Sequence, residues 1–469
     1  MHFDNETLRY FDKNAHARSD WRRRNSFYYN DVESFLTFLI PRGATVLHAG
    51  ADSAALLQKL APRNGVGIHP SAPTIAHIQY TDKAVSYVQC ELADISDTFE
   101  FIVFSDILGH VHDVEAVLRE ASDRTFWNGR IVITQYSALW EPILDFASTI
   151  GLRMPRVVQS WLSGGDLENF ARLAGLEVVR RGTRVLVPFY IPLVSTFFNK
   201  YLGNIFPFTR LGLYHYLVLR KQNARTLIEK PTLSIVVPAR NEAGMIDTIL
   251  RDLTALDCMT ELIFVEGHSS DKTYESIERA VSSYKGNKKI LYTKQSGRGK
   301  GDAVRKGFDM ATSDIITIFD ADMTVPAADI PKFYRAIVEN RGDFINGSRL
   351  VYPLEKQSMR FLNFLGNKFF SMAFSWLLNT RVKDTLCGTK MLWKDDYKAI
   401  QAGRNFFGDF DPFGDFDLLF GASKLNRKII DLPVHYGERT YGTTNIQRWR
   451  HGWLLLKMVV FAMRKIKFI

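Results

Sequence analysis

Cysteine is scarce in this sequence. The three cysteines among 469 residues, Cys90, Cys258 and Cys387, lie far apart along the chain. This spacing matches neither a disulfide framework nor a zinc-binding pattern, so neither is expected to stabilise the fold. A chain that uses so little cysteine fits the reducing environment of the cytoplasm, and we expect the protein there.

Long apolar runs are also lacking. No stretch of about 20 consecutive apolar residues occurs, the length a helix needs to cross a bilayer, so no ordinary transmembrane helix is expected. The chain begins with polar and charged residues over 4–24 rather than with an apolar secretory signal. This stretch ends in the basic sequence Trp-Arg-Arg-Arg at 21–24, and we expect the first 30 or so residues to form a solvated helical segment.

Acidic residues are outnumbered by basic ones. The sequence has 60 lysines and arginines against 50 aspartates and glutamates, which gives a formal net charge of +10. Such an excess favours an anionic partner: nucleic acid, acidic lipid or a phosphorylated substrate. The positive residues form no arm or stripe apart from residues 21–24 and the C-terminal end, so we do not expect nucleic acid. A basic nucleic-acid-binding protein is kept as the alternative of another class.

The first half of the chain has the pattern of an α/β domain. At 469 residues, with 46% hydrophobic and 23% charged residues, the chain is long enough for two or three folded domains. The first of these alternates helices and strands, with helices expected at 32–40 and 54–60 and strands at 45–48, 66–69, 101–104, 130–134 and 214–219. The small-residue turn at 49–53 is typical of a doubly wound sheet, where backbone N–H groups can hold a nucleotide-like ligand.

This half resembles the class I S-adenosylmethionine-dependent methyltransferases over about residues 25–222. Residues 45–57 stand where that family has its glycine-rich cofactor loop. Residues 105–113 match the segment after its fourth strand, and 161–166 match the segment before a late helix. The resemblance implies a Rossmann-like methyltransferase fold. It makes S-adenosylmethionine a candidate cofactor, with four candidate contacts: Gly50, Asp52, His69 and Glu91.

Four positions of this half depart from the family pattern, and two of them, Asp52 and Ala54, stand where the family has further glycines. The family has an acid where His48 stands, and another where His69 stands, at the end of the second strand, which hydrogen-bonds the ribose hydroxyls of the cofactor. Glu91 stands near the place of the acid beside the adenine. A methyltransferase that modifies the lipid carrier or the glycan, and a retained fold that packs, docks or regulates, are both kept as interpretations.

The second half is organised around residues 314–324, Asp-Ile-Ile-Thr-Ile-Phe-Asp-Ala-Asp-Met-Thr. Residues 315–319 are apolar and mostly β-branched, which is typical of a buried parallel strand. The strand ends in Asp320 and Asp322, whose side chains point the same way because they are two residues apart. Two carboxylates on one side suit Mg²⁺ or Mn²⁺, with a diphosphate completing the ligand set. An ordinary strand-to-turn junction is the plain alternative.

Further segments of the second half are expected to meet at that strand end. Strands are predicted at 233–237, 261–266 and 291–293, and a basic glycine-rich loop at 297–303. The loops after the first two strands, at 238–242 and 267–273, carry polar and charged residues. Three strand ends and a basic loop converge in this way at the ligand sites of open α/β sheets.

The ordered set of motifs in this half resembles the family 2 glycosyltransferases over about residues 233–445. Three further motifs, at 346–349, 384–388 and 436–445, make it most similar to the dolichol-phosphate mannose synthase-like branch, which uses polyprenyl phosphates. The resemblance implies a GT-A fold, a nucleotide-sugar donor and inversion at the sugar carbon. It implies a metal on Asp320 and Asp322, and a donor site lined by Pro238, Arg240, Glu242, Glu266, Lys300 and Asp320.

The resemblance also assigns candidate catalytic residues. Arg349 and Arg439 are expected to clamp the donor diphosphate or the acceptor phosphate. The family carries its general base near residues 408–417, where Asp417 matches best and Asp415 second. A hydroxyl acceptor needs such a base, whereas a lipid phosphate is already anionic and does not. We favour a lipid-phosphate acceptor, with a glycan or protein hydroxyl as the alternative.

Three aromatic stretches bear on the membrane. Residues 359–378 and 448–469 combine tryptophan or phenylalanine with lysine and arginine, as interfacial helices do on anionic lipid. Two core helices with a charged edge are the alternative interpretation of the same pattern. Residues 188–216 are expected to be packed between domains rather than to touch the membrane. We therefore expect a peripheral protein at the inner face of the cell membrane, with this domain order: methyltransferase-like 1–222, linker 223–232, GT-A 233–445 and basic amphipathic tail 446–469.

Overall fold

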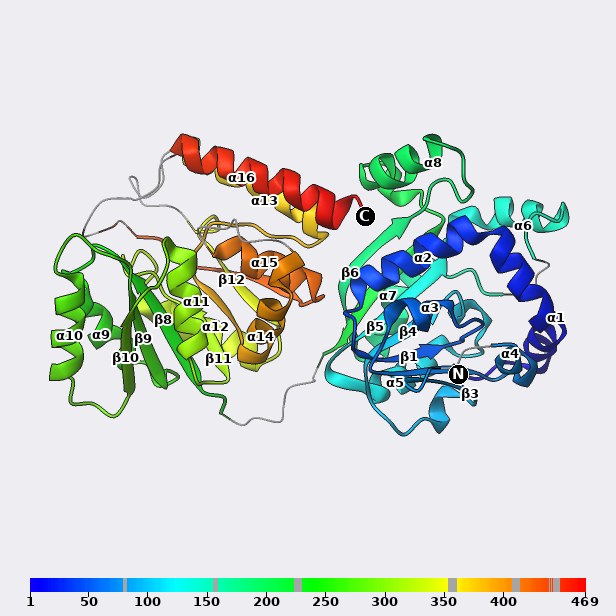
Figure 1. Ribbon diagram of the computed structural model, residues 1–469, viewed down its shortest axis with the longest axis horizontal. Helices are drawn as coiled ribbons and strands as arrows, with labels where there is room; N and C mark the ends of the chain where they lie inside the picture. The colour runs from blue at the N-terminus through cyan, green and yellow to red at the C-terminus, as the bar shows by residue number, and fades with distance from the viewer. Residues whose placement is uncertain are drawn as a thin grey trace. The chain divides into compact units, whose positions relative to one another are not determined.

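The computed structural model describes residues 1–78, 82–154, 159–222, 230–352, 361–406, 414–437, 439, 441 and 448–469. It divides into two compact units, Met1–Ala224 with Phe468–Ile469, and Arg225–Lys467. Each unit contains a seven-stranded sheet packed by helices (Figure 1). The predicted α/β class is confirmed for both halves of the chain.

The N-terminal sheet has the strand order β3-β2-β1-β4-β5-β7-β6. The first five strands are parallel, and β7 runs antiparallel to both of its neighbours. The order changes direction between β1 and β4, which is where open α/β sheets bind ligands. The strands are β1 (Thr45–Ala49), β2 (Asn64–His69), β3 (Val85–Gln89), β4 (Phe99–Ser105), β5 (Thr125–Tyr136), β6 (Leu176–Arg184) and β7 (Tyr214–Lys221).

Apolar side chains on both faces of this sheet form two core clusters. In β1, Val46 joins one cluster, while Leu47 and Ala49 join the other, so the central strand is buried on both sides. Burial on both faces is what the uninterrupted apolar strand sequences predict. The helices are α1 (Asn5–Arg24), α2 (Ser26–Leu39), α3 (Ala55–Leu60), α4 (Ala72–Ala76), α5 (Val114–Arg124), α6 (Glu141–Thr149), α7 (Gly164–Leu173) and α8 (Val194–Thr196).

Helix α1 corrects one expectation from the sequence. The segment is helical as predicted, with Asp4 capping it by accepting from the backbone N–H of Thr7 at 2.7 Å. It is not simply solvated, because Thr7, Phe11 and Ala15 are buried at spacings of four residues. This stripe packs α1 against its own unit and brings its arginines to the carboxyl ends of the strands.

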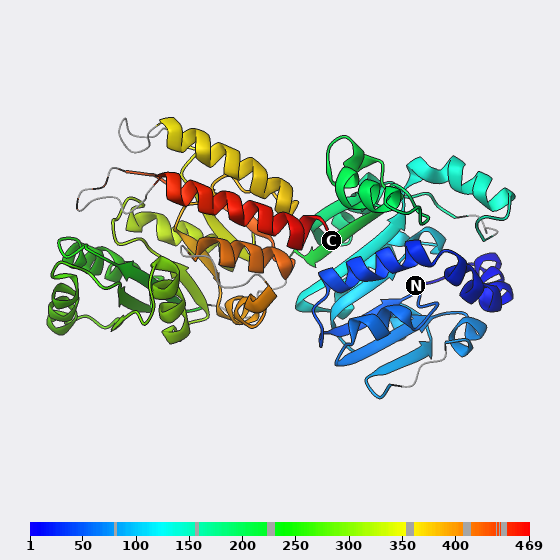
Figure 2. The same ribbon diagram turned by 45° about the horizontal axis from the view of Figure 1, so that its top comes forward.

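The stretch 188–216, which was expected to be packed between domains, leaves several aromatic side chains uncovered by its own unit. Phe189, Phe197 and Phe206 are 59%, 55% and 70% exposed. Together with α6 they leave a large apolar surface on this unit. α6 and the segment around α8 lie at the same end of the unit in both views (Figures 1 and 2).

The C-terminal sheet has the order β10-β9-β8-β11-β13-β12-β14. The predicted parallel strand, β11, pairs in parallel with β8 but in antiparallel with β13, so the sheet is mixed at its centre. β8 lies between β9 and β11, which places the ends of these three strands side by side. The strands are β8 (Leu233–Ala239), β9 (Glu261–Glu266), β10 (Lys289–Lys294), β11 (Ile315–Ile318), β12 (Phe344–Ser348), β13 (Lys390–Trp393) and β14 (Ile429–Pro433).

One helix approaches this sheet unusually closely. A Cβ on Gly307 of α11 would lie 2.3 Å from Cγ1 of Val236 in β8, so only glycine allows this packing distance. The close fit fixes the beginning of α11 beside the strand ends. The helices are α9 (Ile246–Thr254), α10 (Thr273–Ser283), α11 (Lys300–Met310), α12 (Ile330–Val338), α13 (Phe361–Leu378), α14 (Lys394–Ala402), α15 (Asp415–Lys424) and α16 (Arg448–Ala462).

Helices α13 and α16 pack side by side in this unit (Figures 1 and 2). One side of α16 is buried, through Leu455, Met458, Val459 and Ala462. The pair leaves apolar side chains exposed elsewhere: Phe369, Met372, Trp453, Leu456 and Val460. Among the described residues, no helix is both long enough and apolar enough to cross a bilayer.

Candidate active site

Acidic residues gather where β8, β9 and β11 end. Glu242 lies three residues beyond β8, Glu266 is the last residue of β9, and Asp320 and Asp322 follow β11. Because these strands are neighbours and parallel, their carboxyl ends meet at one edge of the sheet. The carboxylates predicted as a metal and donor site are therefore brought to the same edge.

Asp320 is paired with a lysine of α11. The distance from Lys300 Nζ to Asp320 Oδ1 is 2.6 Å. Burial raises the pKa of Asp320, but the positive charges of Lys300, Lys390 and Arg349 lower it by more. The net shift of the pKa is therefore downward, and the carboxylate stays ionised. Gly388 closes over the pair, because a Cβ there would lie 2.1 Å from Asp320 Oδ2.

Asp322 is paired with Arg439, which also reaches a second acid. Arg439 Nη2 donates to Asp322 Oδ2 at 2.6 Å, and Nη1 donates to Glu242 Oε1 at 3.2 Å. The hydroxyl of Thr324 donates to the other oxygen of Asp322 at 2.9 Å. The predicted phosphate clamp therefore links two acids that belong to different strand ends.

Glu242 is the least satisfied acid of this group. Its side chain is buried, and its Oε2 atom has no hydrogen-bond partner within the described parts of the chain. Burial raises the pKa of Glu242 to about 7, against the lowering effect of Arg439, and Asp322, Asp271 and Asp320 raise it further. Glu242 thus leaves one buried carboxylate oxygen at this edge for which no described residue supplies a donor.

Arg349 is held rigidly by a buried aspartate. Its Nε and Nη2 atoms donate to the two oxygens of Asp384 at 2.7 and 2.9 Å. Asp384 is fully buried and also accepts from the backbone N–H of Leu386 at 3.0 Å. Burial raises the pKa of Asp384, and Arg349 with these hydrogen bonds lowers it more, so the pair is ionic. The guanidinium lies over the ring of Tyr436 at 5.2 Å.

The remaining predicted residues of this half have different surroundings. Asp417 is buried in α15 and accepts from Arg404 Nε at 2.8 Å. Asp415 begins α15, and its side chain lies outside the described residues. Glu266 accepts from the backbone N–H of Ser269 at 2.6 Å, which shapes the turn after β9. Pro238 is half-buried in β8, and Arg240 just after it is exposed.

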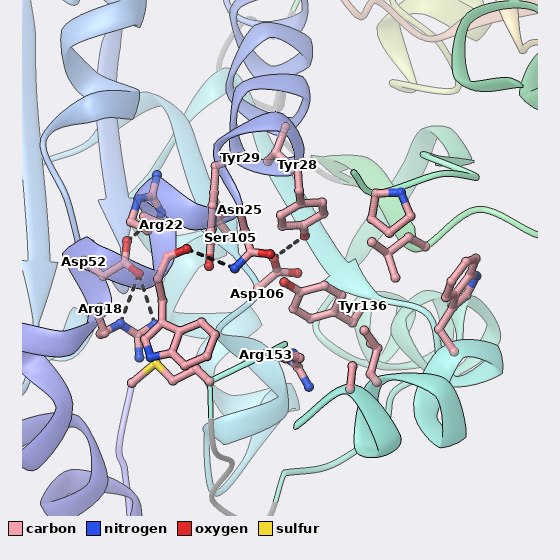
Figure 3. Close-up of a pocket in the computed structure, with 18 of the residues that line it drawn as sticks. Arg18, Arg22, Asn25, Tyr28, Tyr29, Asp52, Ser105, Asp106, Tyr136 and Arg153 are labelled. Atoms are coloured by element: carbon pink, nitrogen blue, oxygen red, sulfur yellow. Dashed lines mark hydrogen bonds and ion pairs between the residues drawn. The ribbon is translucent and has the colours of Figure 1, made fainter. Parts of the chain in front are cut away.

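A cavity of about 690 Å³ lies in the N-terminal unit, at the carboxyl ends of β1, β4 and β5. Gly50 and Asp52, two of the candidate cofactor contacts, line it, and Figure 3 shows Asp52 there. Asp52 accepts from Arg18 Nη2 at 3.0 Å and from Arg22 Nη1 at 3.1 Å. Burial raises the pKa of Asp52, but the two arginines hold it well below its usual range.

The other two residues predicted to contact a cofactor do not line this cavity. His69 is fully buried, with its ring 4.8 Å from that of Phe11 and 5.6 Å from that of Phe3. Burial lowers the pKa of His69 to about 3, so its ring is neutral. The carboxylate of Glu91 is 3.0 Å from Nδ1 of His2.

These surroundings do not fit S-adenosylmethionine held as the resemblance implies. The ribose hydroxyls would need an acceptor at the end of β2, where Phe3 and Phe11 cover a neutral His69. Asp52 already has two arginine partners. No catalytic step through this cofactor is therefore derived from the N-terminal unit.

Comparison with known proteins matches the two halves of the chain to two different families. The family model described as glycosyl transferase family 2 matches residues 234–399. We call the unit that contains this match the glycosyltransferase domain. The model described as a methyltransferase domain matches residues 21–181, in the N-terminal half. The resemblances expected from the sequence are confirmed for both halves.

Curated relatives match the glycosyltransferase domain. A dolichol-phosphate mannosyltransferase from Pyrococcus furiosus is 27% identical over 50% of this chain and 67% of its own length. A dolichyl-phosphate hexose transferase from Haloferax volcanii is 26% identical over 49% of this chain and 92% of its own length. Among solved structures, a SAM-dependent methyltransferase from Thermotoga maritima is 14% identical, covers 46% of this chain and 99% of that chain, and has a TM-score of 0.38.

The glycosyltransferase domain fits a divalent cation only together with a ligand that brings its own oxygens. Among the described residues, no group of three or more histidines, cysteines, aspartates or glutamates is arranged to hold a metal ion. Asp320 and Asp322 supply two carboxylates, and Glu242 lies at the same edge with one oxygen that no described residue satisfies. A diphosphate would provide the remaining oxygen ligands.

Several residues of the glycosyltransferase domain were missed by sequence reasoning. Asp384 and Gly388 belong to a motif that was recognised, but its roles in holding Arg349 and admitting Asp320 appear only in three dimensions. Lys390 is fully buried in β13 and lowers the pKa of Asp320. A lysine at the start of an otherwise apolar strand was the signal for it.

The methyltransferase domain generates a prediction about pH. Burial raises the pKa of Asp106, beside the cavity, to about 6, while Tyr28 donates to its Oδ2 at 2.7 Å. The folded domain binds this proton more tightly than the unfolded chain does. Stability from this group is therefore present at low pH and lost as the pH rises through 6.

We expect Asp106→Asn to remove this dependence. Between pH 5 and pH 7.5, the wild-type free energy of unfolding should fall by about 1.4 kcal/mol relative to the variant. Urea unfolding at both pH values measures the difference. An identical pH dependence in the two proteins would contradict the raised pKa.

Proposed function

We propose that the glycosyltransferase domain transfers a sugar from a nucleotide-sugar donor to the phosphate of a polyprenyl-type lipid. The observation that carries the proposal is the meeting of Asp320, Asp322 and Glu242 at one sheet edge, with Lys300 and Arg439 paired to them. Such a site matches a diphosphate and its counter-ion in charge. The lipid phosphate is supported by the relatives from Pyrococcus furiosus and Haloferax volcanii, both named as dolichol-phosphate enzymes.

Asp320 and Asp322 would hold Mg²⁺ or Mn²⁺. When bound, the ion would neutralise negative charge on the departing nucleoside diphosphate. Lys300 and Arg439 lie against the same two carboxylates, so both can turn to diphosphate oxygens when the donor is present. The nucleotide would lie over the ends of β8 and β9, along Pro238, Arg240, Glu242 and Glu266, and the acceptor would displace it directly with inversion.

The acceptor side of the proposal rests on Arg349 and Asp417. Arg349 uses two of its five N–H groups on Asp384 and is fixed by them, so the remaining ones can be presented to a phosphate. A phosphate acceptor is already ionised and needs no general base. Asp417 then serves to position Arg404 rather than to take a proton.

We further propose that the protein works at the cytoplasmic face of the cell membrane. Helix α16 and the turn after it expose basic residues, Lys457, Arg464 and Lys465, on the same element as Trp453 and Leu456. Apolar groups flanked by lysine and arginine favour the surface of an anionic bilayer. A lipid-linked acceptor would be reached from there.

Metal dependence is the first test. Asp320→Ala and Asp322→Ala should each lower sugar transfer from UDP-glucose or GDP-mannose to dolichyl phosphate by at least about 100-fold, because charge on the leaving group is no longer compensated. EDTA should stop the wild-type reaction, and Mn²⁺ or Mg²⁺ should restore it. Asp395→Ala, at an exposed aspartate of α14, is the matched control. Transfer that survives both EDTA and Asp322→Ala would sink the proposal.

The acceptor type is tested at Asp417. Asp417→Asn keeps an oxygen that can accept from Arg404, so transfer to dolichyl phosphate should fall by less than about tenfold. A general base, by contrast, typically contributes about 10²- to 10⁴-fold. Initial rates at saturating donor measure this. A loss of the larger size, together with faster transfer to a sugar or protein hydroxyl, would favour the alternative acceptor.

Membrane attachment is tested by reversing three charges. The triple variant Lys457→Glu, Arg464→Glu and Lys465→Glu should bind vesicles containing phosphatidylserine at least about tenfold more weakly, since each basic residue contributes about 1 kcal/mol near such a surface. Co-sedimentation with vesicles measures the change. Lys398→Glu, at an exposed lysine of α14, should change little. Equal binding of the triple variant would exclude this helix as the contact.

A further inference from the structure

The cavity of the methyltransferase domain has a polar inner end. Asp106 follows β4 with φ of 53°, a left-handed conformation that is costly for a residue with a side chain, and it lies beside Tyr28 and Tyr136 (Figure 3). His48 lines the same end, and 97% of its surface is buried. Burial lowers the pKa of His48 to about 4, so the ring is neutral.

Several polar atoms at this end are buried without a partner. Within the described residues, both ring nitrogens of His48, Oδ1 of Asp106 and Nη1 of Arg153 have no hydrogen-bond partner. The same holds for Nε2 of Gln159 and Nδ1 of His110. Buried polar groups normally find partners, so this set is suited to a ligand that supplies both donors and acceptors. Hydroxyl groups do both.

Charge at the cavity wall is balanced. Among the described residues that line the cavity, three arginines, Arg18, Arg22 and Arg153, face three carboxylates, Glu33, Asp52 and Asp106. Arg18 and Arg22 are already paired with Asp52 (Figure 3). The wall therefore has no surplus of either sign, which disfavours a phosphate group and favours an uncharged head.

The mouth of the cavity is apolar, in contrast to its inner end. The mouth is lined by apolar side chains from the α6 region and the residues just after it: Ile143, Phe146, Ile150 and Leu152. Phe189, which comes later in the sequence, lines it as well. Phe146 is 65% exposed, Leu152 66% and Phe189 59%. An apolar rim of this kind costs free energy in water and is satisfied by hydrocarbon. A ligand that fits has its polar part inside and an apolar part leaving over the rim.

S-adenosylmethionine does not have this shape. It is charged and polar along its length, and its expected ribose contact, His69, is covered by Phe3 and Phe11 outside the cavity lining. We propose that the cavity of the methyltransferase domain binds the uncharged, hydroxyl-bearing head of a membrane lipid, with the lipid chain leaving over the rim of Phe146, Leu152 and Phe189, in place of the methyl donor.

Calorimetric titration of the full chain tests this with defined probes. Dodecyl maltoside, used below its micelle-forming concentration, carries an uncharged hydroxylated head on a single chain. Maltose is the head alone, dodecyl phosphate has the same chain with an anionic head, and S-adenosylhomocysteine represents the methyl-donor class. We expect saturable binding of dodecyl maltoside, at least about tenfold weaker binding of maltose and dodecyl phosphate, and none of S-adenosylhomocysteine.

Variants locate the binding in this cavity. The double variant Phe146→Ser and Phe189→Ser should weaken dodecyl maltoside at least about tenfold by removing apolar contact at the rim. Asp106→Ala should weaken it similarly by removing an acceptor from the inner end. Phe126→Ser is the matched control, because Phe126 is also exposed, at 42%, but does not line the cavity. Circular dichroism and thermal midpoints establish that each variant is folded.

Three results would overturn the proposal. Unchanged affinity in the folded rim variant would place the detergent elsewhere on the protein. Tighter binding of dodecyl phosphate than of dodecyl maltoside would show that the cavity prefers an anionic head group to an uncharged one. Saturable binding of S-adenosylhomocysteine would show that the cavity accepts the methyl-donor class of ligand instead. Because the rim residues are exposed, the double variant does not depend on core packing, and the test stands even where Asp106→Ala fails to fold.

Discussion

The C-terminal domain depends on keeping a carboxylate ionised at the end of a buried strand. Burial penalises the charge of Asp320, and Asp322 lies only two residues further on. The fold offsets this with two cations brought from distant parts of the sequence: Lys300 at the start of α11 and Arg439 near the end of the domain. The close approach of α11 to the sheet, through Gly307, and the missing side chain of Gly388 keep these pairs in place.

The N-terminal domain uses the corresponding edge of its own sheet differently. Both cavity and carboxylate cluster lie at carboxyl ends of parallel strands, where open α/β sheets offer space and backbone N–H groups. In the N-terminal domain the added helix α1 brings Arg18 and Arg22 to Asp52 and lays Phe11 over His69. The N-terminal edge thus pairs its arginines with acids beside an apolar cavity wall, while the C-terminal edge leaves one oxygen of Glu242 without a partner among the described residues. Two sheets of the same class therefore present different chemistry at the same kind of edge.

Much of the fold could be predicted from apolar periodicity and strand-end motifs. The strands expected around 45–48 and 261–266 lie within β1 and β9, and the acids after β11 stand at the predicted edge. What could not be predicted depends on contacts between residues far apart in sequence. The pairing of Asp417 with Arg404 and the link from Arg439 to Glu242 leave no pattern in the chain. For the same reason, the sequence does not say which aromatic side chains, such as Phe206, the folded unit leaves exposed.

The arginine that joins Asp322 to Glu242 has a thermodynamic consequence. A divalent ion arriving alone would exchange one favourable electrostatic contact for another, so little net free energy would be gained. Under the proposed function, an ion and a diphosphate that arrive together would give the displaced guanidinium new oxygen partners. Affinity for the ion and affinity for the nucleotide would then be linked, each raising the other by the same factor.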